Sequence, residues 1–256
     1  MVNYTTEQIF DKIKESLEKK NPLSIIREGD GEARVLNGFK DVPALEFILK
    51  KLLGEVPSVH EIKEIRANLI EAYENASIIG IPVGKKLDKK DFFWHNSIKI
   101  LFENADPQKL TLKEYVDMDF CYDFLLNGSY HKLFEGLETI NYVSCRNLDE
   151  AFKRRYGIKN ICSFHIAPER KFEPDYVGYK HYPVQFNEIR RWMRAAPLNG
   201  NLFIYGAGVA GKIYGQWAAE YGAVAVDIGS VFDAFAGRVT RGEKRGANSF
   251  DTTYKL

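Results

Sequence analysis

Apolar residues recur at two spacings along the chain, and the spacing separates predicted helices from predicted strands. In the first segment, apolar residues occupy every fourth position from Ile9 to Leu17, as on one face of a helix. Thr5 and Gln8 have the spacing of a capping box just before them, which marks a helix start. The pattern predicts a helix over 5–20.

Short apolar runs alternate with helical patterns through the rest of the chain. The predicted strands are Leu23–Ile26, Ser77–Ile81, Thr139–Ser144, Asn160–Phe164, Leu202–Tyr205 and Val224–Ile228. Helical patterns cover Ala33–Leu36, a segment opened by a capping box at Ser58 and Glu61, Phe92–Phe102, Leu148–Tyr156, Gln185–Arg194 and Val209–Tyr221. A further capping box, Thr111 with Glu114, predicts a helix start inside 105–137, a stretch whose pattern is mostly helical.

Strands that alternate with helices predict a parallel sheet, because each parallel connection must cross over the sheet. We therefore expect an α/β fold: a single Rossmann-like domain over 1–237, with a mainly parallel sheet and helices on both faces. The last residues, 238–256, are polar and contain glycine. They predict a C-terminal tail or lid.

Composition narrows the function classes. Lys and Arg total 36 against 35 Asp and Glu, so the net charge of +1 argues against a nucleic-acid partner. No apolar run approaches the roughly 20 residues that span a bilayer, and the first residues lack a signal-peptide pattern. We expect a soluble cytoplasmic protein that meets a membrane only at its surface and has no transmembrane segment. A homodimer is left open.

One glycine-rich motif lies between a predicted strand and a predicted helix. Gly206, Gly208 and Gly211 have GxGxxG spacing, and the next predicted strand carries Asp227 near its end. This arrangement is typical of dinucleotide sites, where backbone amides approach a pyrophosphate and the acid binds a ribose. The alternative is a tight turn whose glycines serve packing alone, and the motif leaves both open.

A second motif follows the first predicted strand. Asp30 and Glu32 flank Gly31 in a turn that also contains Arg27 and Gly29. Ligands of open α/β sheets bind at the carboxyl ends of strands, and paired carboxylates suit Mg²⁺ or Mn²⁺. A guanidinium beside them can bind phosphate. The alternative is a solvated turn in which the aspartate caps a helix.

The segment from Ser24 to Glu32 resembles the signature of the GT-D-type glycosyltransferases, formerly a domain of unknown function (DUF1792). That signature has the form Ser, two hydrophobic residues, Arg, any residue, then Gly-Asp-Gly-Glu. Further similar landmarks are Ile79–Pro82, Ser144–Asn147 and Ala225–Gly229. The resemblance extends over about residues 20–236, and the chain has Ser230 where the family often has histidine.

The resemblance implies a GT-D-like fold, a nucleoside-diphosphate sugar donor and a divalent metal bound through the D-x-E motif. Carried onto this sequence, the metal ligands are Asp30 and Glu32, the expected ion is Mn²⁺ or Mg²⁺, and the expected nucleotide is UDP. The implied acceptor is a hydroxyl of a glycan, glycoprotein or lipid-linked glycan.

The remaining candidate residues follow predicted strands. His165 and Glu169 come after Asn160–Phe164, where either could act as the base on an acceptor hydroxyl; the alternative is a packed loop. Arg146 and Asn147 precede a helix and could bind the donor, although Asn147 also suits a helix cap. The full candidate donor-binding set is Arg27, Gly29, Gly31, Gly80, Pro82, Arg146, Asn147, Gly206, Gly208, Asp227 and Gly229.

The leading hypothesis is a metal-dependent glycosyltransferase in which Asp30, Glu32, His165 and Glu169 are the candidate catalytic residues. Two alternatives remain from the sequence. One is an NAD(P)-dependent oxidoreductase that uses the glycine-rich motif with Asp227. The other is a non-catalytic subunit that binds a nucleotide or a glycan.

Overall fold

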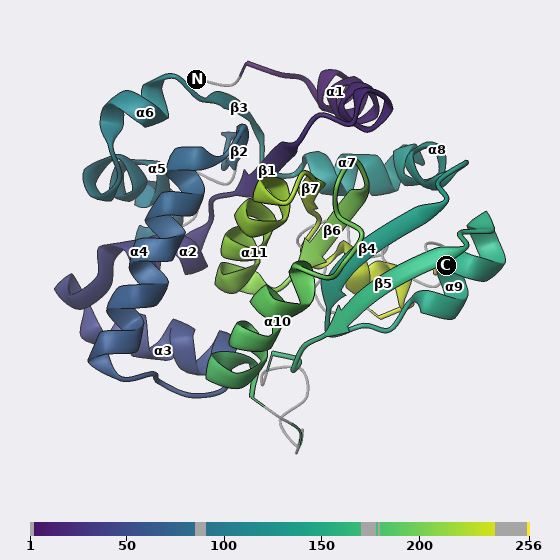
Figure 1. Cartoon of the computed structure of the whole chain (residues 1–256). Coiled ribbons are helices and arrows are strands. Elements are labelled where there is room, and N and C mark those ends of the chain that lie inside the picture. Colours follow the sequence, from purple (N-terminus) through teal and green to yellow (C-terminus); the bar gives the residue numbers. More distant parts are fainter. Residues whose placement is uncertain (1–2, 85–90, 170–177, 179, 239–254) are drawn as a thin grey trace.

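Seven parallel strands form one sheet in the order β3-β2-β1-β7-β6-β4-β5 (Figure 1). The computed structural model describes residues 3–84, 91–169, 178, 180–238 and 255–256. The strands are β1 (Leu23–Arg27), β2 (Ile78–Ile81), β3 (Glu114–Asp117), β4 (Thr139–Ser144), β5 (Asn160–His165), β6 (Leu202–Gly206) and β7 (Val224–Asp227).

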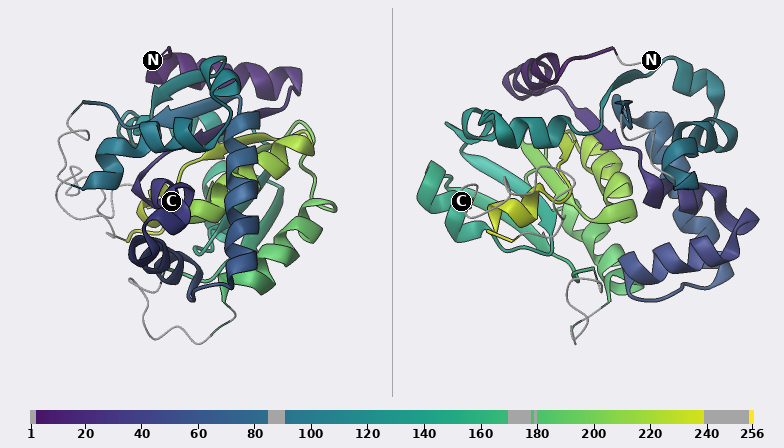
Figure 2. Two further views of the ribbon diagram at one scale, coloured as in Figure 1. Left: turned by 90° about the vertical axis from the view of Figure 1, so that its left-hand side faces the viewer. Right: turned by 180° about the vertical axis from the view of Figure 1, so that it is seen from behind.

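Helices cover both faces of this sheet, as the front view in Figure 1 and the reverse view in Figure 2 show together. One face is packed by α2 (Asp30–Asn37), α3 (Val42–Leu53), α4 (Val59–Asn75), α5 (Phe92–Asn104), α6 (Pro107–Thr111), α10 (Phe186–Met193) and α11 (Gly208–Glu220). The other face is packed by α1 (Thr6–Lys19), α7 (Phe120–Leu126), α8 (Ser129–Phe134), α9 (Asp149–Tyr156) and α12 (Val231–Phe235). Short turns of helix cover Gly38–Lys40 and His181–Gln185.

The central strands are apolar on both sides because the sheet is buried between two hydrophobic cores. All five residues of β1 are buried; Ile26 packs into one core, while Leu23 and Ile25 pack into the other. Continuous apolar runs of this kind are characteristic of parallel strands that are covered on both faces. The predicted α/β fold with helices on both faces is confirmed.

Two of the three predicted capping boxes are formed. The Thr5 hydroxyl accepts from the Gln8 amide at 3.2 Å and opens α1, and Ser58 opens α4 in the same way. The third prediction, at Thr111 and Glu114, is wrong. Thr111 is the last residue of α6 and its hydroxyl donates to the Pro107 carbonyl, while Glu114 begins β3.

Strand β3 is therefore a missed strand inside a stretch that was predicted to be mostly helical. Its segment, Glu114–Asp117, is short, and it pairs with β2 at the edge of the sheet. Long-range pairing in an edge strand overrides a local four-residue motif. The sequence patterns also left α3 unassigned.

The register aligns the carboxyl ends of the strands at one edge of the sheet. Arg27 of β1 lies opposite Gly80 of β2, Asp227 of β7 lies opposite Tyr205, and Ser144 of β4 lies opposite Gly206. Residues that follow these strands are thus gathered at a single edge, although the sequence spreads them over most of the chain.

In the described part of the chain, no helix combines the length and apolar character needed to cross a bilayer. The predicted tail or lid, 238–256, lies outside the described residues over 239–254. At the end of the chain, the Leu256 amide donates to the Phe235 carbonyl at 3.0 Å.

Gly206 provides a test of how closely β6 and β7 approach each other at this edge. A Cβ at this position would lie 2.5 Å from the Gly229 carbonyl oxygen and 2.8 Å from the Phe232 ring. We expect Gly206→Ala to lower the free energy of unfolding by about 1–3 kcal/mol, measured by equilibrium urea denaturation.

Gly31→Ala is the matched control. A Cβ on Gly31 would meet its nearest neighbour, Ile48, at an ordinary 3.6 Å inside helix α2. Alanine is favoured over glycine in a helix by roughly 0.5–1 kcal/mol, so this variant should be as stable as the parent or more so. Equal stability of Gly206→Ala and the parent would show that the loops are not tightly packed.

Candidate active site

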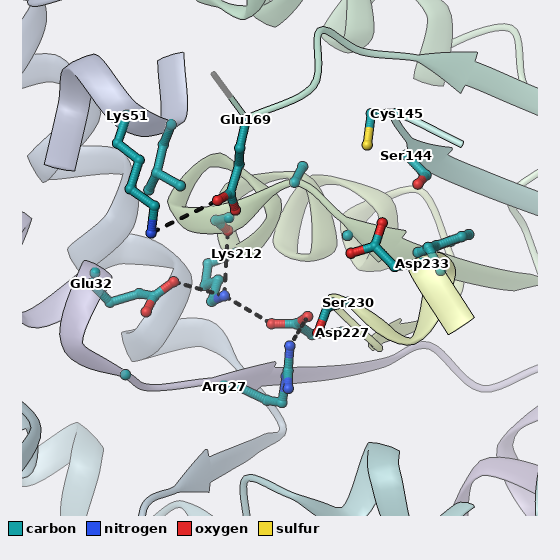
Figure 3. Close-up of a pocket in the computed structure, with 18 of the residues that line it drawn as sticks. Arg27, Glu32, Lys51, Ser144, Cys145, Glu169, Lys212, Asp227, Ser230 and Asp233 are labelled. Carbon is teal, nitrogen blue, oxygen red and sulfur yellow. Dashed lines mark hydrogen bonds and ion pairs between the residues drawn. The ribbon is translucent and has the colours of Figure 1, made fainter. Parts of the chain in front are cut away.

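The loops that follow β1, β3, β4, β5, β6 and β7 surround an open cavity of about 160 Å³. Figure 3 shows side chains from several of these loops pointing toward its centre. The cavity lies at the carboxyl ends of the strands, which is where open α/β sheets bind their ligands.

The turn after β1 places two carboxylates on the cavity wall. Helix α2 begins at Asp30, so Asp30 and Glu32 both lie in its first turn, where the helix dipole favours negative charge. Gly29 is the N-terminal cap residue, and it contributes no side-chain hydrogen bond to the helix. The short turn therefore directs both acids to the sheet edge.

Lys212 is the cation at the centre of the site. Its ammonium lies 2.7 Å from Glu32 Oε1 and 2.9 Å from Asp227 Oδ2, and it donates to the Gly208 carbonyl at 3.3 Å. Figure 3 shows it between the two carboxylates. The ammonium thus has two ion-pair partners and one backbone hydrogen bond.

Arg27 completes a buried chain of alternating charges. Its Nη2 lies 3.0 Å from Asp227 Oδ1, and its Nη1 donates to the Cys121 sulfur at 3.0 Å. The order of charges is thus Arg27, Asp227, Lys212 and Glu32, and each side chain is at least nine-tenths buried. Arg27 supports Asp227 at the wall of the cavity.

The charged state of this chain follows from its partners. Burial by itself raises the pKa of Asp227, but Arg27 and Lys212 outweigh burial and lower that pKa below its ordinary value. Burial by itself lowers the pKa of Lys212, and Asp227 and Glu32 reverse the effect, so the pKa is raised overall. Both groups are charged at neutral pH.

Two other carboxyls on the β1–α2 turn have the opposite shift. Burial, followed by the charge of Glu32, raises the pKa of Asp30 against the opposing effects of Arg34 and Lys51. Glu28 is fully buried on the cavity lining, and burial together with Glu32 raises its pKa well above the ordinary range. This turn therefore holds several acidic groups close together, and burial and mutual repulsion oppose the ionisation of Asp30 and Glu28.

Glycines make room for Arg27. A Cβ on Gly229, which has φ +51°, would lie 2.0 Å from Arg27 Nη2. A Cβ on Gly80 would lie 3.1 Å from both Arg27 Cγ and the Met118 backbone. The segments Ile79–Pro82 and Ala225–Gly229, which resemble those of the family, thus pack around the Arg27 side chain.

The glycines of the GxGxxG motif also have packing roles. Gly208 has φ +55°, which side-chain-bearing residues rarely adopt, and Gly211 packs against Tyr205 of β6, with a Cβ position only 3.1 Å away. Asp227, the acid of the motif, is 2% exposed and held by Arg27 and Lys212. Both of its carboxylate oxygens face these cations, whereas the acid of a dinucleotide site binds a ribose hydroxyl.

The structure brings most of the predicted site residues into the cavity lining. These are Arg27, Gly29, Asp30, Gly31, Glu32, Arg146, Glu169, Gly206, Gly208, Asp227 and Gly229. Arg146 is held by Asp233 of α12, with Nε 2.8 Å from the carboxylate. Glu169 faces Lys51 of α3 at 3.7 Å (Figure 3).

Four predicted residues lie outside that lining: His165, Gly80, Pro82 and Asn147. His165 is exposed at the end of β5, and its Nε2 lies 3.2 Å from the Tyr142 hydroxyl. Asn147 accepts from the Asp149 amide at 3.1 Å at the start of α9, close to the capping role considered for it. Of the two candidate bases, Glu169 faces the cavity and His165 does not.

Asp30 and Glu32 suit a hard divalent cation. Among the described residues, Asp30 accepts no hydrogen bond and has only Arg34 Nε as an ion-pair partner, 3.9 Å away. The ion pair of Glu32 uses Oε1; Oε2 lies beside Gly29, 3.1 Å from the position of a Cβ there. Two carboxylates close together repel each other, and a bound Mg²⁺ or Mn²⁺ would relieve that repulsion while using their oxygens as ligands.

The two carboxylates do not form a complete metal site by themselves. The described ranges contain no group of three or more His, Cys, Asp and Glu side chains arranged to hold a metal ion. A cation at Asp30 and Glu32 would therefore take its other ligands from water or from a bound anion, as Mg²⁺ commonly does.

The sequence patterns did not identify Lys212, Lys51, Glu28 or Asp233. Lys212 had a recognisable signal: it is the only basic residue in the apolar helix Gly208–Glu220, and it directly follows the glycine-rich motif. Lys51, Glu28 and Asp233 had no comparable signal, because their roles depend on contacts between distant segments.

Asp227 offers a direct test of the buried charges. Replacing it with asparagine leaves Arg27 and Lys212 short of a negative partner, so Asp227→Asn should cost about 3–5 kcal/mol of unfolding free energy at pH 7. The pKa of Asp227 is lowered in the folded state, so its stabilisation is present above the unfolded pKa and is lost as pH falls through the folded value. The difference from the parent should narrow below about pH 4, as measured by denaturation at several pH values.

The exposed pair of Glu15 and Lys19 supplies the control. Glu15→Gln removes a carboxylate from an ion pair in the same way, but at the surface, and it should leave the unfolding free energy unchanged. Equal effects of the two substitutions would contradict a buried network held by Asp227.

Comparison with known proteins agrees with this architecture. The model of the GT-D fold-like domain matches residues 4–165. A structure described as a new glycosyltransferase (DUF1792) from Streptococcus sanguinis has a TM-score of 0.59 and 13% identity, covering 91% of this chain and 83% of that chain. A structure described as domain of unknown function 1792, with a distinct glycosyltransferase fold, has a TM-score of 0.59 and 12% identity, covering 96% of this chain and 88% of that chain. No curated protein matches. The matched region exceeds half of the sequence, and the chain belongs to the GT-D fold-like family.

Proposed function

We propose that the protein is a glycosyltransferase that moves a sugar from a nucleoside-diphosphate donor to a hydroxyl acceptor. The observation that carries this proposal is the Arg27–Glu32 turn, which opens into a cavity at the carboxyl edge of a parallel sheet. Family membership and the description of two similar folds as glycosyltransferases support it. The expected nucleotide is UDP, and the acceptor is a glycan, glycoprotein or lipid-linked glycan.

We expect the donor diphosphate to bind between the first turn of α11 and the β1–α2 turn. Gly206, Ala207 and Gly208 line the cavity there, and Ala207 caps the helix without a side-chain hydrogen bond. Amides of an open helix start favour phosphate oxygens. Arg27 acts indirectly, because its outer nitrogens are held by Asp227 and Cys121.

Asp30 and Glu32 would hold a Mn²⁺ or Mg²⁺ ion, which when bound neutralises charge on the departing nucleoside diphosphate. The role of these two residues is to fix the position of that positive charge before the reaction. Electrostatic groups fixed in this way supply much of the rate enhancement in such transfers.

Glu169 is the better candidate for the base that accepts the acceptor's proton. It lines the cavity and has Lys51 at 3.7 Å, whereas His165 lies outside the lining. Trp94 and Met118 supply apolar surface near Gly29, which suits the flat face of a sugar or base.

The double variant Asp30→Asn with Glu32→Gln tests the proposal. It removes both anionic ligands while keeping side-chain size, and we expect release of UDP from a panel of UDP-sugars with Mn²⁺ to fall by at least about 100-fold. Glu103→Gln, an exposed residue of α5 paired with Lys99, is the control and should retain the parent rate. Full activity in a folded double variant would refute the proposed role of the motif, and activity lost in both proteins would point to nonspecific damage.

Ligand-induced stabilisation separates this function from a dinucleotide-dependent oxidoreductase. A ligand that binds the folded state raises the melting temperature. We expect a UDP-sugar with Mn²⁺ to raise it and NAD(H) to leave it unchanged, because Asp227 is occupied by Arg27 and Lys212. Stabilisation by NAD(H) alone would favour the oxidoreductase. Binding of UDP-sugar without any turnover would favour a non-catalytic subunit.

A further inference from the structure

Lys212 occupies an unfavourable place for a lysine. It is 5% exposed and lies within the apolar helix α11, one turn after the helix begins at Gly208. A buried ion pair gives little net stability once desolvation is counted. The three contacts of Lys212, with Glu32, Asp227 and Gly208, therefore call for an explanation in terms of the site.

One consequence concerns the carboxylate of Glu32. Lys212 lies 2.7 Å from Oε1, so it fixes the carboxylate plane and leaves Oε2, beside Gly29, for another ligand. The ammonium also places a positive charge next to any cation that binds there, and two like charges this close repel in a site of low dielectric.

The other ligand, Asp30, also has cations near it. Arg34 Nε lies 3.9 Å from its carboxylate, and Lys51 lines the same cavity (Figure 3). Each of the two carboxylates thus has a cation near it, Lys212 beside Glu32 and Arg34 beside Asp30, that opposes the binding of a metal ion. A diphosphate would bring further oxygen ligands and negative charge that offsets these cations.

We propose that Lys212 is a positioning residue that keeps the cation site weak until the donor's diphosphate arrives, so that the divalent cation binds together with the nucleotide. This rests on the proposed function, in which Asp30 and Glu32 hold the cation. In the free protein, the Lys212 ammonium contacts one carboxylate oxygen of Glu32 and supplies the positive charge that neutralises this carboxylate.

The test measures Mn²⁺ binding to the full chain by the electron paramagnetic resonance signal of free Mn²⁺, with and without UDP. For the parent protein, we expect affinity for Mn²⁺ alone to be at least about tenfold weaker than in the presence of saturating UDP, after correction for Mn²⁺ bound by UDP in solution. Equal affinity under the two conditions overturns the proposal.

Neutral substitutions at Lys212 test its part in this coupling. Lys212→Met removes a positive charge beside Glu32, so affinity for Mn²⁺ alone should rise by about tenfold or more and its dependence on UDP should shrink. Lys212→Gln does the same while keeping a donor for Glu32, and it serves if the methionine variant does not fold. Lys212→Arg keeps the charge and should retain the parent's weak binding of Mn²⁺ alone.

The matched control is Lys12→Met. Lys12 pairs with Glu114 at 2.6 Å, where β3 begins, which is the end of the sheet opposite to the cavity. Its removal should leave Mn²⁺ affinity unchanged. A folded neutral variant of Lys212 that binds Mn²⁺ alone no more tightly than the parent overturns the proposal.

These binding equilibria are independent of turnover. If Mn²⁺ and UDP bind together with the expected dependence on Lys212 but no sugar is transferred from any donor, the proposed function fails and this inference stands. If sugar is transferred but neutral variants at Lys212 leave Mn²⁺ affinity unchanged, the inference fails and the proposed function stands.

Discussion

Charge compensation among Arg27, Asp227, Lys212 and Glu32 is the constraint on which the site depends. The four side chains are buried and contact one another in that order. The distances are 3.0 Å from Arg27 to Asp227, 2.9 Å from Asp227 to Lys212 and 2.7 Å from Lys212 to Glu32. Two cations and two carboxylates balance, so each of these four charges has an opposite partner, and a buried charge without one would be costly. This network of four charges joins β1, β7, α11 and α2, and it fixes the relative positions of the loops that form the cavity.

The backbone near this network is adapted to the size of Arg27. Gly229 and Gly80 leave space for its guanidinium and its side-chain stem, and the register of β1 with β2 brings Gly80 beside it. Gly206, the last residue of β6, allows the β6 and β7 loops to approach each other. A buried charged side chain can thus lie in the cavity wall because its neighbours lack side chains there.

Local sequence patterns predicted the elements of the fold well, since short apolar runs and capping residues act over a few positions. The strands from Thr139 onward and the helix starts at Thr5 and Ser58 match the structure. The misassigned strand β3 and the site partner Lys212 depend on contacts between distant segments, which a local motif does not encode. The carboxylates of the first turn of α2 were identified from the sequence, but their partners were not.

The two motifs that suggested competing functions in the sequence belong to one site. The strands β1 and β7 are neighbours in the sheet, so the turn after β1 meets both the helix α11 and the end of β7. Lys212, one residue after the glycine-rich motif, binds Glu32 of the acidic motif; Asp227, the acid expected for a ribose, binds Arg27. The spacing of the glycines could not distinguish a dinucleotide site from a packed turn, because a tight connection from a strand to a helix needs similar glycines in both cases. The partner of Asp227 makes the difference: an acid neutralised by two buried cations holds loops together, and an acid free at a strand end binds a ligand.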